Sequence, residues 1–190
     1  MRRVNQPLTL FVVAALAGCV EATNNAPIDA HAARDVAAVH LDPAAATEML
    51  NAYRASQNLG AVRLDPALTA MAQRQADAMA AANQMSHDVA GNFPSRLAAA
   101  GVDAVAAAEN LGGGYYSLQE AMDGWRRSPA HNANLTMPDA KRFGIAIAKD
   151  PRTHYGVYWA MEMAGEPRAR TAGYSWGMQI APAGAAVEGQ

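Results

Sequence analysis

The sequence has little cysteine, few aromatic residues and little charge. Cys19 is the single cysteine among 190 residues, which excludes an internal disulfide and a cysteine-rich zinc site. Aromatic residues make up 6% and charged residues 17% of the chain, with a formal net charge of −2. Phosphate binding needs a surplus of basic residues, so this charge balance argues against nucleic acid as a partner.

Apolar residues, in contrast, are plentiful. They make up 51% of the chain, and alanine contributes a large part of them. A chain of this length can bury the core of one domain without disulfides, and so rich an apolar composition excludes wholesale disorder. Alanine has the highest helix propensity, so we expect a helix-rich fold.

The first residues follow the pattern of a secretory signal peptide. Arg2 and Arg3 precede an apolar run that is too short to anchor the chain across a bilayer. The run ends in Leu-Ala-Gly-Cys, which resembles the bacterial lipobox, where the cysteine is lipidated and becomes the mature N-terminus. An ordinary signal peptide cleaved at a nearby alanine is the alternative. We predict a lipoprotein signal peptide over 1–18, lipidation of Cys19 and attachment to a membrane of the cell envelope after secretion.

The remaining chain divides into three parts by composition. Residues 19–41 show no strong hydrophobic period and are predicted to be a tether between the anchor and the domain. The domain is predicted over 42–165. Residues 166–190 are rich in alanine, glycine and proline and are predicted to be a tail, disordered or partly packed through Tyr174 and Trp176.

Two helices are predicted from the same start signal, an aspartate followed by proline. Aspartate caps a helix well, and proline is tolerated at the first helical position. The first helix is predicted to begin at Asp42 and to stop at Gly60. The second is predicted to begin at Asp65 and to end near Asn83. Apolar residues recur at helical spacing after both starts.

Two further helices are predicted in the middle of the chain. A short helix covers 94–100 and is closed by Gly101. The next begins at Ser117, with Glu120 as its capping-box partner, and breaks around Ser128, which precedes a proline.

The segments around these helices are less regular. Residues 103–108 are compatible with either helix or connector, and 111–114 are predicted to be a flexible glycine loop. The period then changes, because 143–148 and 155–164 are short apolar runs separated by a segment with turn chemistry. They predict an antiparallel hairpin.

The predicted core combines apolar residues from these helices and strands. We expect burial of Met49, Leu50, Tyr53, Leu68, Met71, Met79, Leu97, Met122, Trp125, Phe143, Ile145, Ile147, Val157 and Trp159.

Three polar residues on separate segments could carry chemistry. His87, Glu109 and His131 could meet in one cleft, and two imidazoles with a carboxylate can bind zinc or a similar cation. Their spacing matches no short metalloprotease signature such as H-E-x-x-H, so spacing alone favours ordinary surface histidines.

The order of five short motifs resembles the CAP superfamily, the SCP-like extracellular proteins that include pathogenesis-related protein 1. The motifs are Met-Ser-His, Ala-Glu-Asn, Trp-x-x-Ser-Pro-x-His, Phe-Gly-Ile-Ala and Tyr-Trp, and they lie between residues 46 and 165. The resemblance implies an α+β fold, an α-β-α sandwich with a small antiparallel sheet between helices.

The resemblance also implies a site. Two His and two Glu line the family's central cleft, and several members bind a divalent cation there. His87, Glu109 and His131 match three of these residues and are the expected metal ligands. The fourth, a Glu that normally follows the Trp, has no match because Arg-Arg-Ser-Pro follows Trp125.

Two further residues lie beside these ligands in the sequence. Ser86 and Asn110 are expected to hydrogen-bond the ligand imidazoles, which usually need such a partner. The alternatives are an ordinary helix-end serine and an ordinary turn asparagine. Glu162 is left out of the site. The family commonly has Gln one place earlier, where this chain has Met161, so we expect Glu162 to face away from the cleft.

These observations predict a non-enzymatic binding module of the cell envelope. Its cleft is expected to hold a divalent cation such as zinc, a lipid-like ligand or a protein partner. The alternative is a metal-dependent hydrolase that uses the same cleft, and an idle structural protein is a third reading. No serine lies in a G-x-S-x-G elbow, and the cysteine is used by the anchor, so no nucleophile is evident.

Overall fold

The structure, a computed structural model, describes residues 30–167. The predicted signal peptide, the lipidation of Cys19 and most of the predicted tail therefore lie outside the described residues. Within the described part, no helix combines the length and apolarity needed to cross a membrane. In chain order the elements are α1 (Ala30–Ala38), α2 (Pro43–Ser56), β1 (Arg63–Leu64), α3 (Pro66–Ala82), α4 (Phe93–Ala99), β2 (Ala107–Gly113), α5 (Leu118–Arg127), α6 (Pro129–Leu135), β3 (Arg142–Lys149) and β4 (Val157–Ala164).

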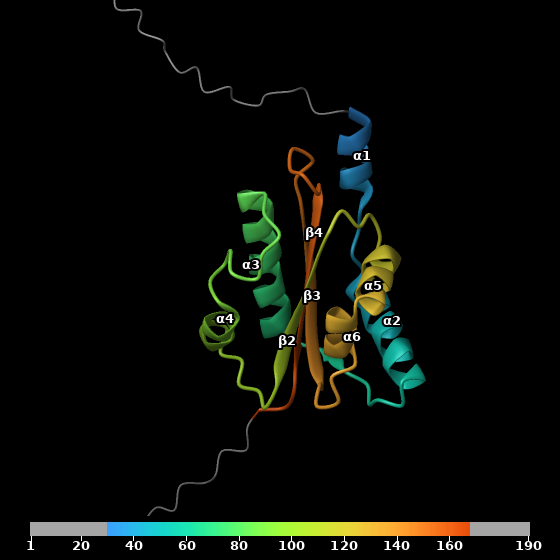
Figure 1. Cartoon of the computed structure of the whole chain (residues 1–190), viewed down its shortest axis with the longest axis vertical. Coiled ribbons are helices and arrows are strands. Elements are labelled where there is room, and N and C mark those ends of the chain that lie inside the picture. Colours follow the sequence, from blue (N-terminus) through green and yellow to red (C-terminus); the bar gives the residue numbers. More distant parts are fainter. Residues whose placement is uncertain (1–29, 168–190) are drawn as a thin grey trace, which may run out of the picture.

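A four-stranded sheet lies between two layers of helices (Figure 1). The strand order is β1-β3-β4-β2, with β4 antiparallel to both neighbours and the short β1 parallel to β3. Side chains alternate along β4, so Tyr158 and Ala160 pack toward α3, whereas Trp159 and Met161 pack toward α2 and α5. The α-β-α sandwich implied by the resemblance is confirmed, as is the predicted hairpin of β3 and β4.

The two Asp-Pro starts form helices for the predicted reason. The Asp42 carboxylate accepts from the Ala44 amide at 2.8 Å, and the Asp65 carboxylate accepts from the Ala67 amide at 2.9 Å. The predicted end of the first helix is wrong, because α2 stops at Ser56, well before Gly60. Asn58 reverses the chain there with a left-handed backbone, φ 57°, a conformation that asparagine tolerates.

Part of the predicted tether belongs to the folded domain. Residues 30–38 form α1, and Val36 and Val39 are buried in the core on the α2 side of the sheet. The Lys149 ammonium donates to the Ala37 and Val39 carbonyl oxygens, both at 3.0 Å, and fastens the segment to β3. The tether prediction is therefore corrected for residues 30–41, because two valines suffice to dock so short a helix.

The predicted glycine loop is also corrected, because residues 111–113 belong to strand β2. A side chain at Gly112 would meet the Tyr115 ring at 2.9 Å. At Gly113 an added Cβ would lie 2.5 Å from Met85 Cε and 2.7 Å from the Tyr155 ring. These glycines serve close packing rather than flexibility. Residues 103–108, which were compatible with helix or connector, form no helix, and the last two of them belong to this strand.

The chain after Ser128 forms a helix that the sequence reading did not predict. The Ser117 hydroxyl caps α5 by accepting from the Glu120 amide at 3.2 Å, and α5 ends at Arg127 as expected. Pro129 then starts α6 instead of ending helical structure, since proline fits the first turn of a helix.

The predicted core is largely confirmed. The exceptions are Met49, Tyr53, Leu97 and Ile147, which are only partly buried. Trp125 is 1% exposed, and its indole donates to the Leu111 carbonyl oxygen at 2.8 Å. This bond gives a partner to a carbonyl oxygen of β2 that points away from the sheet. β2 is an edge strand, and the candidate site lies beside it.

Candidate functional site

The three predicted ligands come from three elements that meet at β2. His87 follows α3, Glu109 lies on β2 and His131 lies on α6. Glu109 faces the α3 layer with Leu111, whereas Asn110 faces α6. The fold therefore brings the segments of all three residues to one edge of the sheet.

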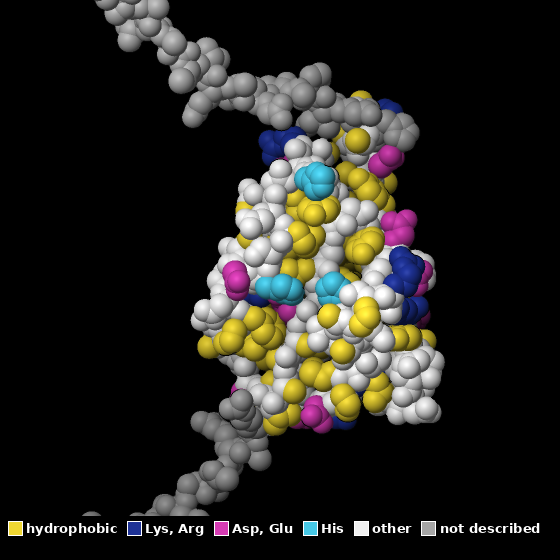
Figure 2. Space-filling view, in the orientation of Figure 1, with side chains coloured by type: hydrophobic (Ala, Val, Ile, Leu, Met, Phe, Trp, Pro, Cys, Tyr) yellow, Lys and Arg dark blue, Asp and Glu magenta, His cyan; other side chains and the backbone are white. Residues whose placement is uncertain are grey.

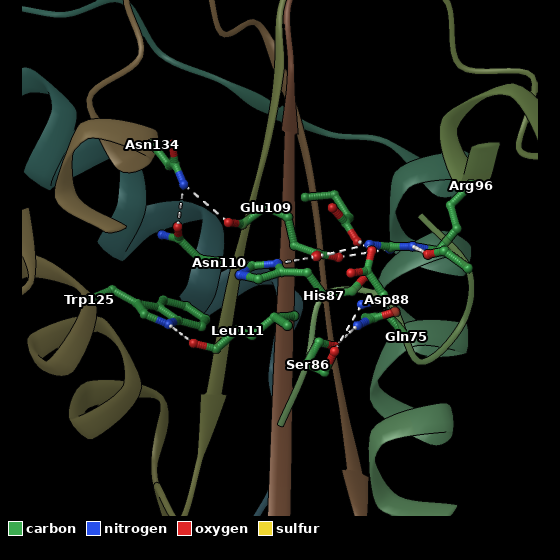
Figure 3. A network of polar contacts seen from close by, with 12 residues as sticks. Gln75, Ser86, His87, Asp88, Arg96, Glu109, Asn110, Leu111, Trp125 and Asn134 are labelled. Carbon is green, nitrogen blue, oxygen red and sulfur yellow. Dashed lines mark hydrogen bonds and ion pairs between the residues drawn. The ribbon is translucent and has the colours of Figure 1, made fainter. Parts of the chain in front are cut away.

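His87 is attached to Glu109 by a short hydrogen bond. Its Nδ1 lies 2.6 Å from Glu109 Oε1, as Figure 3 shows. The side chain of His87 is 57% exposed and that of Glu109 only 3% exposed. An ionised carboxylate only accepts hydrogen bonds, so Nδ1 carries the proton when the imidazole is neutral. The lone pair of Nε2 is then available to a ligand.

Arg96 on α4 holds the Glu109 carboxylate in place through contacts with both of its oxygens. Its Nη1 lies 2.7 Å from Glu109 Oε2, and its Nη2 donates to Oε1 at 2.9 Å. The same guanidinium donates to the His87 carbonyl oxygen at 3.0 Å and to the Gly91 carbonyl oxygen at 2.9 Å. Arg96 therefore orients both the carboxylate and the backbone of the loop that carries His87.

Glu162, which was expected to face away from the cleft and was left out of the site, joins this cluster. It lies directly opposite Glu109 in the pairing of β2 with β4, and it is fully buried. Its Oε1 lies 3.3 Å from Arg96 Nη1. Side chains alternate along β4, so Glu162 lies on the same face as Tyr158 and Ala160, and the sequence had not indicated β2 as the strand beside it.

The pKa of Glu162 is raised to about 9, chiefly by burial. The charge of Glu109 and a side-chain hydrogen bond with Glu109 contribute to this rise, and Arg96 opposes it. Glu162 is therefore a neutral carboxylic acid at neutral pH, and it can act as a hydrogen-bond donor.

Asn110 supports the backbone of His131 rather than its ring. Its amide donates to the His131 carbonyl oxygen at 3.0 Å, and its Oδ1 accepts from Asn134 at 2.9 Å. Asn134 also donates to the Glu109 carbonyl oxygen at 3.1 Å. These bonds hold α6, and with it His131, against β2.

Ser86 shapes the turn before His87. Its carbonyl oxygen accepts from the Gln75 amide at 2.7 Å, and its hydroxyl accepts from the Asp88 amide at 3.2 Å. Both bonds order the loop after α3, so Ser86 acts on the backbone of the loop.

His131 and His87 are close enough to interact electrostatically. Partial burial lowers the pKa of His131, and the charge of His87 lowers it further. Figure 2 shows two histidine side chains at the same level in the middle of one face of the molecule. A lowered pKa keeps the imidazole of His131 neutral at neutral pH, which is the form that can donate a lone pair.

Residues 47–163 match the CAP model, described as the cysteine-rich secretory protein family. The chain belongs to the CAP family. No curated protein matches the chain.

Solved CAP-domain structures confirm the fold. An extracellular protein with an SCP domain from Bacillus anthracis is 21% identical with a TM-score of 0.57, over 67% of this chain and 45% of that chain. An outer surface protein from Borrelia burgdorferi is 19% identical with a TM-score of 0.57, over 67% of this chain and 98% of that chain.

A cysteine-rich secretory protein from Staphylococcus aureus is similar over a smaller part of its own length. It is 15% identical with a TM-score of 0.54, over 65% of this chain and 38% of that chain. This CAP protein therefore spans less than half of the Bacillus and Staphylococcus chains. At these identities the likeness concerns the fold.

The CAP domain does not present the three predicted ligands as one metal-binding set. Among the described residues, no group of three His, Cys, Asp or Glu side chains is arranged to hold a metal ion. The Glu109 carboxylate is nearly inaccessible because it contacts both His87 and Arg96. The groups that remain available to a ligand are the imidazoles of His87 and His131.

Proposed function

We propose that this CAP domain is a non-enzymatic binding module of the bacterial cell envelope that presents two imidazoles, His87 and His131, to a ligand. The hydrogen bond from the exposed His87 to the buried Glu109 carries this proposal. A carboxylate behind a histidine fixes its tautomer and raises its basicity, as in many metal sites. An imidazole with only a structural role would not need its outer nitrogen left accessible.

The ligand class that this chemistry favours is a divalent cation such as zinc. His87 and His131 would hold it, while Glu109 would orient His87 instead of acting as a ligand. Two protein donors leave further coordination positions open, so a bound cation would supply Lewis acidity to a partner's carboxylate or carbonyl group. We expect weaker affinity than that of a closed structural zinc site.

Titration calorimetry with zinc chloride on the purified chain tests this proposal. Binding should be present in the wild-type protein and at least about tenfold weaker in His87→Ala and His131→Ala, because each variant removes one donor. His40→Ala is the matched control, since His40 is also exposed but lies beside α2 and β3. Equal binding by all four proteins, or no zinc binding by any, would refute the cation assignment.

Two other outcomes would redirect the function. Binding of phospholipid vesicles that is lost in both site variants would identify a lipid-like ligand instead. Casein hydrolysis that disappears in Glu109→Gln would support the metal-dependent hydrolase. The geometry disfavours this second outcome, because a general base must reach its substrate and the Glu109 side chain is 3% exposed.

We also propose that Cys19 is the lipidated N-terminus that attaches the domain to a membrane. The Leu-Ala-Gly-Cys motif supports this assignment, and the Borrelia and Bacillus relatives are described as outer surface and extracellular proteins. Cys19→Ser should release the protein from the membrane fraction or block its maturation. An unmodified chain that starts elsewhere, by intact-mass analysis, would refute the anchor.

A further inference from the structure

Arg96 contacts the two buried carboxyl groups of the site unequally. It makes two short contacts with Glu109, at 2.7 and 2.9 Å, one to each carboxyl oxygen. Glu162 receives one longer contact, at 3.3 Å from the same guanidinium. All three side chains are at most 7% exposed, so water does little to stabilise their charges.

This inequality assigns the charges within the cluster. One buried cation can neutralise one carboxylate, and a second negative charge would remain uncompensated at high cost. The two close contacts stabilise the ionised form of Glu109. Glu162 therefore keeps its proton, which its Oε2, a buried oxygen without a hydrogen-bond partner, is placed to carry.

The charge on Glu109 in turn determines the proton position on His87. Ionised Glu109 accepts from Nδ1–H, and the outward Nε2 keeps a free lone pair. Protonated Glu109 would instead donate to Nδ1, and the proton of the neutral ring would move to Nε2. The exposed atom of the site would then be a donor that cannot coordinate a cation.

We propose that Arg96 is a positioning residue of the ligand site, and that Glu162 is the neutral partner that lets Arg96 hold Glu109 ionised. Together they set the tautomer of His87. Arg96 also bonds the His87 and Gly91 carbonyl oxygens, so it fixes the loop as well as the ring. The binding of a ligand by the Nε2 lone pair of His87 rests on the proposed function, whereas the assignment of the Nδ1–H tautomer does not.

Long-range ¹H–¹⁵N NMR of the histidine rings tests the assignment directly. Spectra are recorded on the full chain at pH 8 in EDTA, so that no cation is bound. Wild-type His87 should give the signature of a single tautomer with the proton on Nδ1. Arg96→Met should convert it to a mixture of tautomers, while Arg96→Lys, which keeps the cation, should restore most of the Nδ1–H form.

The variant Glu162→Gln tests whether Glu162 acts as an uncharged partner in this cluster. Glutamine is uncharged and its amide can donate to Glu109, so the Nδ1–H signature should persist. Arg63→Met is the matched arginine control, because Arg63 is exposed and pairs with Glu166. Arg63 lies on β1, at the opposite edge of the sheet from β2, and its loss should leave the His87 signals unchanged.

Three results would overturn the assignment. They are an Nε2–H tautomer in the wild-type protein, an unchanged His87 signature in folded Arg96→Met, and a changed signature in Glu162→Gln. The wild-type and Glu162→Gln spectra remain decisive even if Arg96→Met does not fold. An Nδ1–H tautomer in a protein that binds no zinc would refute the proposed function alone, and zinc binding with an Nε2–H tautomer would refute this inference alone.

Discussion

Two buried arginines, Arg54 and Arg96, lie on opposite sides of the sheet and have opposite kinds of partner. Arg54 on α2 is fully buried and donates to the carbonyl oxygens of Gly60, Leu135 and Met137 at 2.8, 2.9 and 3.1 Å. Arg96 on α4 contacts the two carboxyl groups described above.

The difference shows how one residue type serves two purposes. Backbone carbonyls do not titrate, so Arg54 joins the segment after α2 to the segment after α6 in a way that does not depend on pH. Burial alone lowers the pKa of Arg54, without a compensating carboxylate. The partners of Arg96 do titrate, and they connect it to an exposed imidazole. Arg54 therefore stabilises the fold, and Arg96 organises a surface.

On the face of the sheet where Arg54 lies, Trp125→Ala should have the largest effect on the free energy of unfolding. Trp125 is 1% exposed, and the change removes a large core side chain together with the donor to the Leu111 carbonyl oxygen. We expect the free energy of unfolding to fall by about 3–5 kcal/mol, measured by urea denaturation. Efficient quenching of Trp125 fluorescence by acrylamide in the native wild-type protein would contradict the core assignment.

Arg54→Met should have the next largest effect. Methionine keeps much of the side-chain length but leaves several buried carbonyl oxygens without a donor, at a total cost of about 3 kcal/mol. The His87 NMR signature should stay unchanged, because Arg54 lies on the other face of the sheet. Arg63→Met, which removes an exposed ion pair, should leave the free energy of unfolding nearly unchanged. A changed His87 tautomer in Arg54→Met would contradict the separate roles of Arg54 and Arg96.

The stability that the cluster around Arg96 contributes should depend on pH. The pKa of Glu162 is about 9 in the folded state and near 4.5 when unfolded, so the folded state binds a proton more tightly. Its contribution to stability is complete below about pH 4.5 and is lost as pH rises toward 9. We expect this loss to exceed about 1.4 kcal/mol, the equivalent of one pKa unit.

Glu162→Gln isolates that contribution, since glutamine does not titrate. Urea denaturation at intervals from pH 5 to about 9 should show a smaller decline in the variant than in the wild-type protein. The Arg54→Met variant should keep the wild-type decline. An equal pH dependence in wild type and Glu162→Gln would show that Glu162 is not a proton-binding group of the folded state.

The smallest expected effect comes from a change at Asn110, which joins β2 to α6 and so holds His131 in place. Asn110→Ala removes the donor to the His131 carbonyl oxygen and the acceptor of Asn134, and should cost about 1–2 kcal/mol of unfolding free energy. The zinc affinity of the site should fall, because α6 then holds His131 less firmly. The control is Asn51→Ala, which removes side-chain bonds to the Val62 backbone near β1 and should leave zinc binding unchanged.

Much of the fold could be predicted because its signals are local. The aspartate caps at Asp42 and Asp65, the serine cap at Ser117 and the turn between β3 and β4 act over a few residues, and each formed where it was expected. The reciprocal bond of the predicted capping box did not form as expected, because Glu120 accepts from the Tyr116 amide. The order of the CAP motifs predicted the sandwich and brought His87, Glu109 and His131 into consideration.

The tertiary structure decided what local signals cannot. Gly112 lies in a strand because the Tyr115 ring leaves no room for a side chain there, and Val36 docks α1 onto a core assembled from distant segments. Glu162 faces Glu109 through the register of two strands, and Arg96 reaches Glu162 across 66 positions of sequence. Capping and periodicity are short-range effects and could be read from the sequence. Strand register and the protonation of buried carboxyl groups depend on which distant residues become neighbours, so only the folded chain determines them.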